Sequence, residues 1–260
     1  GKMDRVHVDV TRPEQTKTEG LKLPVVYESS PYYAGVANGG SELFWDVKHE
    51  LGEKVPNPVH VEVQRRGERP IISNSQISTW VPRGYIVVHS SSPGTGLSDG
   101  APTVGGKNES LAFWSTGKVG MTGTSYNGTI PLAAATTGVD GLEAIIPIAP
   151  NTSYYHYYRS NGLVRSPGGY LGEDIDVLYE FIHSGKEENR ARNNKLIRDT
   201  EMANGMDRIS GDYNDFWAGR DYLTQMKPMK AALLMSHGFN DWNVMPEHSY
   251  RIYKKATEMG

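Results

Sequence analysis

One stretch near the middle of the chain, Lys118 to Thr129, constrains the fold more than any other. A short apolar run enters it, a turn of small residues carries Ser125, and a helix-like run from Ile130 to Thr136 leaves it. A nucleophile elbow has this layout, because a strained turn between a strand and a helix lifts the serine hydroxyl clear of the sheet. The stretch therefore predicts a strand, a sharp turn and a helix, with Ser125 at the apex.

Glycines around the turn support this interpretation only in part. Glycine removes Cβ atoms where the strand and the helix nearly collide. Of the general pattern G-x-S-x-G, Gly123 is present, Asn127 occupies the second glycine position, and Gly128 follows one residue late. The pattern alone leaves an alternative open, namely a plain turn rich in glycine and serine before a helix.

Apolar runs of strand length alternate with helical patterns along most of the chain, which is typical of an α/β fold. Strands are predicted at 5–10, 23–28, 59–63, 85–89, 142–149 and 231–236, and helices at 174–183, 187–208 and 246–255. Strand-like runs are absent between 150 and 225. The sequence therefore predicts one partial α/β-hydrolase domain over 1–260, with a mostly parallel sheet and with 150–225 as a helical cap insertion, by analogy at the level of fold.

The composition limits the function classes. A formal net charge of −3 gives no electrostatic case for nucleic acid or an anionic membrane surface, and no apolar run approaches a membrane span. The absence of cysteine removes disulfides and thiol nucleophiles and suits the cytoplasm. His49-Glu50 begins like the zinc motif H-E-x-x-H, but residue 53 is Glu. No cofactor and no metal is expected, and a homo-oligomer is compatible with the sequence.

Several motifs, in a fixed order, resemble one family. The elbow reads G-x-S-Y-x-G, and further matches are Ser30–Tyr33, Tyr157–Gly169, Gly172–Asp174, Ser210–Asn214 and His237–Val244. In these motifs the chain resembles the catalytic domain of the X-prolyl dipeptidyl aminopeptidases, serine peptidases related to cocaine esterases and α-amino acid ester hydrolases. The resemblance spans most of the chain.

The resemblance implies a serine peptidase that releases X-Pro dipeptides from peptide N-termini through an acyl-enzyme on Ser125. Asp241, just past a predicted strand, would be the acid of the triad. The oxyanion hole would use the backbone N–H of Tyr126 and, by family analogy, the phenol of Tyr32. From the sequence alone, Tyr32 also reads as an ordinary loop aromatic.

The resemblance also implies the substrate contacts. The family clamps the free amino terminus with residues that fall on Glu173 and Asn243, and Tyr154 occupies a pocket position that is tryptophan in some members. Alternatives stay open from the sequence alone. Acidic residues such as Glu173 are favoured at the start of a helix by its dipole, and tyrosines near 154 also suit packing within a cap.

A catalytic histidine is missing from its expected place. In α/β-hydrolases it follows the acid, after a further strand. His237 precedes Asp241, and His248 falls inside a predicted helix, where an exposed residue is expected. By resemblance to the family, the histidine is expected beyond Gly260, so that residues 1–260 would be a fragment and inactive alone. An esterase or amino acid ester hydrolase of the same superfamily, or a non-catalytic fragment, are the alternative functions.

Overall fold

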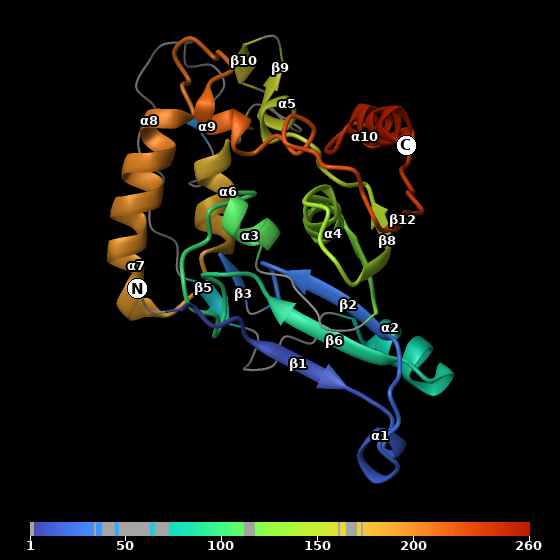
Figure 1. Ribbon diagram of the computed structural model, residues 1–260. Coiled ribbons are helices and arrows are strands. Elements are labelled where there is room, and N and C mark those ends of the chain that lie inside the picture. Colours follow the sequence, from blue (N-terminus) through green and yellow to red (C-terminus); the bar gives the residue numbers. More distant parts are fainter. Residues whose placement is uncertain are drawn as a thin grey trace.

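A six-stranded sheet forms the centre of the protein (Figure 1). The computed structural model describes residues 3–33, 35–37, 45–46, 63–65, 73–111, 118–160, 162–164, 171–172 and 174–260. The strand order is β1-β6-β2-β7-β8-β12, and only β1 runs antiparallel to its neighbour. The strands are β1 (Val8–Thr11), β2 (Val25–Ser30), β6 (Ile86–Ser91), β7 (Val119–Thr124), β8 (Leu142–Ile148) and β12 (Ala232–Leu233). The predicted mostly parallel sheet is confirmed.

Helix α4 (Tyr126–Thr136) begins directly after β7 and packs against β2, β7 and β8. Every one of its residues is buried. A helix buried on all sides is apolar or small all round, which explains why this run lacks charged residues. Leu132 of α4 and Ile145 of β8 belong to the same hydrophobic core. The helix that follows Ser125 and the strand β8 are therefore anchored in the same core.

The remaining elements are short. Small strands pair as β3 (Gly35–Ala37) with β5 (Val63–Arg65), β4 (Trp45–Asp46) with β11 (Leu171–Gly172), and β9 (Arg159–Ser160) with β10 (Leu163–Val164). The other helices are α1 (Gln15–Thr18), α2 (Asn74–Trp80), the 3-10 turn η2 (Val81–Arg83), α3 (Lys107–Leu111), α5 (Tyr154–Tyr158), α6 (Ile175–Ile182), α7 (Glu187–Asn193), the π-helical η3 (Asn194–Met202), α8 (Ala203–Gly205), α9 (Asp215–Ala218) and α10 (Glu247–Met259).

The predicted elements form with shifted bounds, and the strand predicted at 59–63 lies outside the described residues except for Val63. Helices α6 to α9 lie beyond the ends toward which β2 and β6 point (Figure 1). The division of the chain at 150 and 225 stays a prediction. Within the described ranges, no helix is both long and apolar enough to cross a membrane.

A buried ion-pair network fixes the start of α6. Asp174 caps this helix by accepting the N–H of Ile175 at 2.8 Å. The guanidinium of Arg159 donates to both carboxylate oxygens of Asp174 at 3.0 Å, and both side chains are 0% exposed. Arg208 adds a bond to Asp174 at 2.9 Å and another to Asp176 at 2.5 Å. Buried charges persist only when they are paired and hydrogen-bonded, and here they are.

Candidate active site

Ser125 lies at the turn between β7 and α4 in a strained backbone conformation. Its φ is 60° and its ψ is −123°, a region that non-glycine residues seldom adopt. Its N–H donates to the carbonyl of Ile148 at 2.9 Å, and its own carbonyl accepts the N–H groups of Gly128 and Thr129. These bonds tie the turn to β8 and to the first turn of α4. The predicted strand, sharp turn and helix are therefore present.

Both glycines of the turn are required by close backbone approach. A Cβ on Gly123 would lie 2.4 Å from the carbonyl oxygen of Asn127, and one on Gly128 would lie 2.7 Å from the carbonyl oxygen of Gly123. The second close approach thus falls at Gly128. A glycine is therefore needed at 128, one residue after the usual second glycine position, which Asn127 occupies.

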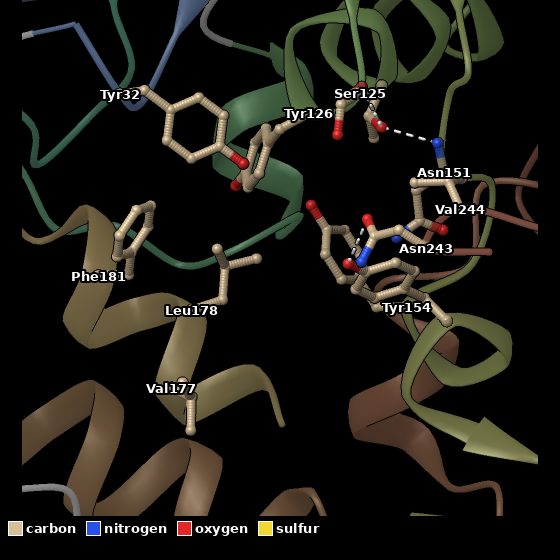
Figure 2. Close-up of a pocket in the computed structure, with 12 residues that line it drawn as sticks. Tyr32, Ser125, Tyr126, Asn151, Tyr154, Val177, Leu178, Phe181, Asn243 and Val244 are labelled. Carbon is tan, nitrogen blue, oxygen red and sulfur yellow. Dashed lines mark hydrogen bonds between the residues drawn. The ribbon is translucent and has the colours of Figure 1, made fainter. Parts of the chain in front are cut away.

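A cavity of about 270 Å³ opens at this turn (Figure 2). It is bounded by the start of α4, the loop after β2, helices α5 and α6, and the loop after β12. Its lining residues are Tyr32, Ser125, Tyr126, Thr129, Asn151, Tyr154, Tyr157, Val177, Leu178, Phe181, Asn243 and Val244. The cavity therefore brings together Tyr32, Ser125, Tyr126, Tyr154 and Asn243, which the sequence placed in one site.

The two residues of the expected oxyanion hole lie side by side. Tyr126 follows Ser125 as the first residue of α4. Tyr32 follows β2, and its backbone N–H donates to Ser30 Oγ at 3.1 Å. Their rings meet edge to face at 5.9 Å between centroids, and Figure 2 shows both at the same side of the cavity. Their role as oxyanion donors stays a prediction.

Asp241 lies in the turn after β12 and is not one of the residues that line the cavity. Its Oδ1 accepts the backbone N–H groups of Asn243 and Val244, each at 3.0 Å. Its Oδ2 is 3.7 Å from His237 Nε2. Asp241 therefore shapes the loop that presents Asn243 and Val244 to the cavity.

Both histidines near Asp241 are hydrogen-bonded to groups other than Ser125. His237 Nε2 donates to the carbonyl of Val244 at 2.7 Å, and its Nδ1 accepts from Ser249 Oγ at 2.6 Å. The prediction that His248 is exposed is wrong, because His248 is only 2% exposed and its Nδ1 accepts the N–H of Thr152 at 3.2 Å. Among the described residues, no histidine lines the cavity. A catalytic histidine beyond Gly260 stays a prediction.

Of the three residues predicted to contact the substrate, the structure describes Asn243 and Tyr154 but not Glu173. The phenol of Tyr157 donates to Asn243 Oδ1 at 3.1 Å. Tyr154 is buried in α5 and stacks on Tyr158 at 6.3 Å while also lining the cavity, so it combines packing with a place in the site. Glu173 lies outside the described residues, directly before the helix cap Asp174.

Sequence reasoning did not assign the wall that α6 contributes. Val177, Leu178 and Phe181 line the cavity opposite the turn. Their spacing predicted an apolar helical face, but a face that lines a cavity has the same period as one that packs into a core. No signal in the sequence separates the two.

A buried carboxyl, Glu28, contacts the start of helix α4, next to Ser125. Glu28 is 5% exposed, and its two oxygens accept from Asn127 Nδ2 at 3.1 Å and from Gln76 Nε2 at 2.6 Å. It thereby links α2 to α4. Burial, partly opposed by the bond from Asn127, raises the pKa of Glu28 from 4.5 to about 7.

This raised pKa predicts a pH-dependent effect of Glu28→Gln on stability. With a folded pKa above the unfolded one, the native state binds more protons between about pH 4.5 and 7, so ionisation lowers the free energy of unfolding as the pH rises through that window. Glutamine resembles the protonated form. Glu28→Gln is expected to change stability little at pH 5 and to stabilise by up to about 3 kcal/mol at pH 8.

Thermal unfolding at both pH values measures this effect. Glu143→Gln, at an exposed position of β8, is the matched control and should show no such difference between the two pH values. Equal effects of Glu28→Gln at pH 5 and pH 8 would contradict the prediction.

Comparison with known proteins matches the whole chain to one family. A family model described as X-Pro dipeptidyl-peptidase (S15 family) matches residues 1–260. A Rhodopirellula baltica relative that carries an Xaa-Pro dipeptidyl-peptidase name is 59% identical over 288 aligned residues, which cover 100% of this chain and 46% of the relative. The Xaa-Pro dipeptidyl-peptidase of Ligilactobacillus salivarius is 34% identical, covering 100% of this chain and 39% of that protein. The chain thus spans about half the length, or less, of these curated relatives.

Solved structures share the fold. An α-amino acid ester hydrolase superposes with a TM-score of 0.56 at 18% identity, covering 98% of this chain and 44% of that one. A CocE/NonD family hydrolase from Staphylococcus aureus superposes with a TM-score of 0.57 at 18% identity, covering 98% and 42%. Both are hydrolases by name, and the likeness confirms the predicted fold class.

Proposed function

Because the chain belongs to the X-Pro dipeptidyl-peptidase (S15) family, we propose that its cavity is the active site of a serine peptidase that releases X-Pro dipeptides from peptide N-termini. The observation that carries the proposal is the strained Ser125 at a cavity also lined by Tyr32, Tyr154 and Asn243. A serine in this setting is typical of a nucleophile, since its hydroxyl is held away from the sheet.

In the proposed reaction, Ser125 Oγ attacks the carbonyl carbon of the proline while a histidine takes its proton. The backbone N–H of Tyr126 and the phenol of Tyr32 donate to the carbonyl oxygen as it gains charge. The leaving amine takes the proton, and water then hydrolyses the acyl-enzyme. Asp241 would orient the histidine, which we expect to lie outside residues 1–260.

The cavity favours a short and partly apolar substrate. Its volume of about 270 Å³ is small for a ligand pocket, and its walls are aromatic rings and the aliphatic face of α6. Flat rings pack well against a pyrrolidine. Asn243 Oδ1 and the carboxylate of Glu173 would hold the free amino group, so that proline-containing peptides with a free N-terminus are the proposed substrates.

Hydrolysis by the full-length protein tests the function. We expect Gly-Pro anilide to be cleaved with a kcat/KM well above that for Gly-Ala anilide, because only proline fills the aromatic pocket. A simple aryl ester is the comparison substrate. Cleavage of the ester with no cleavage of Gly-Pro anilide would reject the peptidase and favour an esterase of the same superfamily.

A further inference from the structure

A buried carboxyl that the proposed reaction does not use lies behind the cavity. Glu109, in α3, is 3% exposed. Its Oε2 accepts the phenol O–H of Tyr126 at 2.7 Å and the backbone N–H of Gly105 at 2.6 Å. Its Oε1 has no hydrogen-bond partner within the described part of the chain. The contacts of this carboxyl are thus concentrated on one oxygen and on Tyr126.

Tyr126 connects this carboxyl to the reacting centre. Its backbone directly follows Ser125, and its ring meets Tyr32 at 5.9 Å and Tyr154 at 6.2 Å, both edge to face. Figure 2 shows these rings around the cavity beside Ser125. A shift of the Tyr126 ring would therefore disturb Tyr32 as well as the turn at Ser125.

We propose that Glu109 is a positioning residue for the oxyanion hole. By accepting the phenol of Tyr126, it holds that ring in place, and through the ring it fixes the backbone N–H of Tyr126 and the phenol of Tyr32. The inference rests on the proposed serine hydrolase function and goes beyond it, since Glu109 itself touches neither substrate nor nucleophile.

The chemistry of the buried cluster supports this role. Burial, and then the charge of Glu109, raises the pKa of Tyr126 well above its usual range, so its phenol keeps its proton and donates. Burial also raises the pKa of Glu109, against the bonds from Tyr126 and Gly105 and the charge of Arg220. Oε2 remains the acceptor in either protonation state of the carboxyl, because a proton on Oε1 leaves Oε2 free to accept.

A second contact of Glu109 must be separated from this role. Gly105 forms part of a tight loop, where Tyr222 donates to its carbonyl at 3.1 Å and a Cβ would lie 2.0 Å from the Tyr154 ring. Loss of Glu109 could therefore act through Gly105 alone. The Gly105 N–H is shared between Glu109 Oε2 at 2.6 Å and the phenol oxygen of Tyr126 at 3.2 Å. Tyr126→Phe removes the phenol and its longer contact with Gly105 but keeps the shorter bond from Gly105 to Glu109, so it tests mainly the link to the turn at Ser125.

The test compares Glu109→Leu, Glu109→Gln, Tyr126→Phe and the double variant that combines Glu109→Leu with Tyr126→Phe, all in the full-length enzyme. The first measurement is the second-order rate at which a fluorophosphonate labels Ser125, because that reaction builds negative charge in the same oxyanion hole. The second is kcat and KM for Gly-Pro anilide, with active sites counted by titration so that unfolded protein does not contribute.

Glu109→Leu is expected to lower the labelling rate and kcat by about 10- to 100-fold, somewhat less than removal of an oxyanion donor itself, with KM nearly unchanged. Glu109→Gln should retain most of the activity, since its amide oxygen can accept both bonds. Tyr126→Phe should match Glu109→Leu, and the double variant should lose no more than either, because coupled residues are not additive.

Two results would overturn the proposal. One is that Tyr126→Phe is labelled at the wild-type rate per active site. This result would reject the role of Glu109 even if Glu109→Leu does not fold. The other is a double variant whose losses multiply. If the wild-type enzyme labels at Ser125 but does not cleave Gly-Pro anilide, the peptidase function fails, and the labelling rates still test Glu109.

Discussion

Ser125→Ala in the full-length enzyme is expected to abolish turnover while the protein stays folded. Loss of a triad nucleophile typically lowers kcat by a factor on the order of 10⁴ to 10⁶. The turn should survive, because it is held by backbone bonds from Ser125 to Ile148, Gly128 and Thr129 that alanine also makes. Hydrolysis of Gly-Pro anilide and thermal unfolding together measure the two expectations.

The matched control is Ser92→Ala. Ser92 is buried, and its hydroxyl has no hydrogen-bond partner among the described residues, so its loss should leave kcat close to wild type. Near-normal hydrolysis by Ser125→Ala would refute the assignment of the nucleophile.

Blocking the substrate's amino terminus is expected to have the second largest effect. If Glu173 and Asn243 hold a cationic amine, acetylation leaves a desolvated carboxylate without its partner, at a cost of about 3–5 kcal/mol. The kcat/KM of N-acetyl-Gly-Pro anilide should therefore fall by a factor on the order of 10² to 10⁴ relative to the free amine. Activity on the free amine should also fall as the pH rises through its pKa, about 7.7–8.0, because the cation loses its proton.

Variants show whether these residues cause the loss. Glu173→Gln and Asn243→Ala should raise KM for Gly-Pro anilide. They should also reduce the ratio of kcat/KM between the free and the acetylated substrate. Hydrolysis of an aryl ester without an amine is the internal control and should change little in Glu173→Gln. If the wild type cleaved the acetylated and free substrates equally well, Glu173 and Asn243 would not bind the amino group, and the esterase function would be favoured.

The sequence predicted the elbow because its signal is local. A strand, a turn and a helix within one short stretch leave few alternatives once Gly123 and Gly128 are read as points of close approach. The parallel strands were predictable for the same reason, since each buried run is contiguous. The resemblance then assembled Tyr32, Tyr154 and Asn243 with Ser125, and the structure brings all of them to one cavity.

The buried polar contacts could not be predicted, because they join distant parts of the chain. Glu109 reaches Tyr126 and Glu28 reaches Asn127 only after the sheet forms, and a lone Glu in sequence reads as solvated surface. The burial of His248 was not predicted for this reason, because its partner Thr152 lies far away in the chain, in the loop between β8 and α5. Such buried polar partners leave no periodic signature.

The Arg159–Asp174 pair constrains the helix that forms one wall of the cavity. Dissolved ions screen charges that face water, but both side chains of this pair are fully enclosed, so ionic strength has little access to it. The helix that begins at Asp174 therefore keeps its orientation across salt conditions. If the cavity binds substrate as proposed, new preferences are most readily acquired by exchanging side chains such as Leu178 and Phe181 on an unmoved backbone, whereas tilting the helix would require breaking a fully buried ion pair.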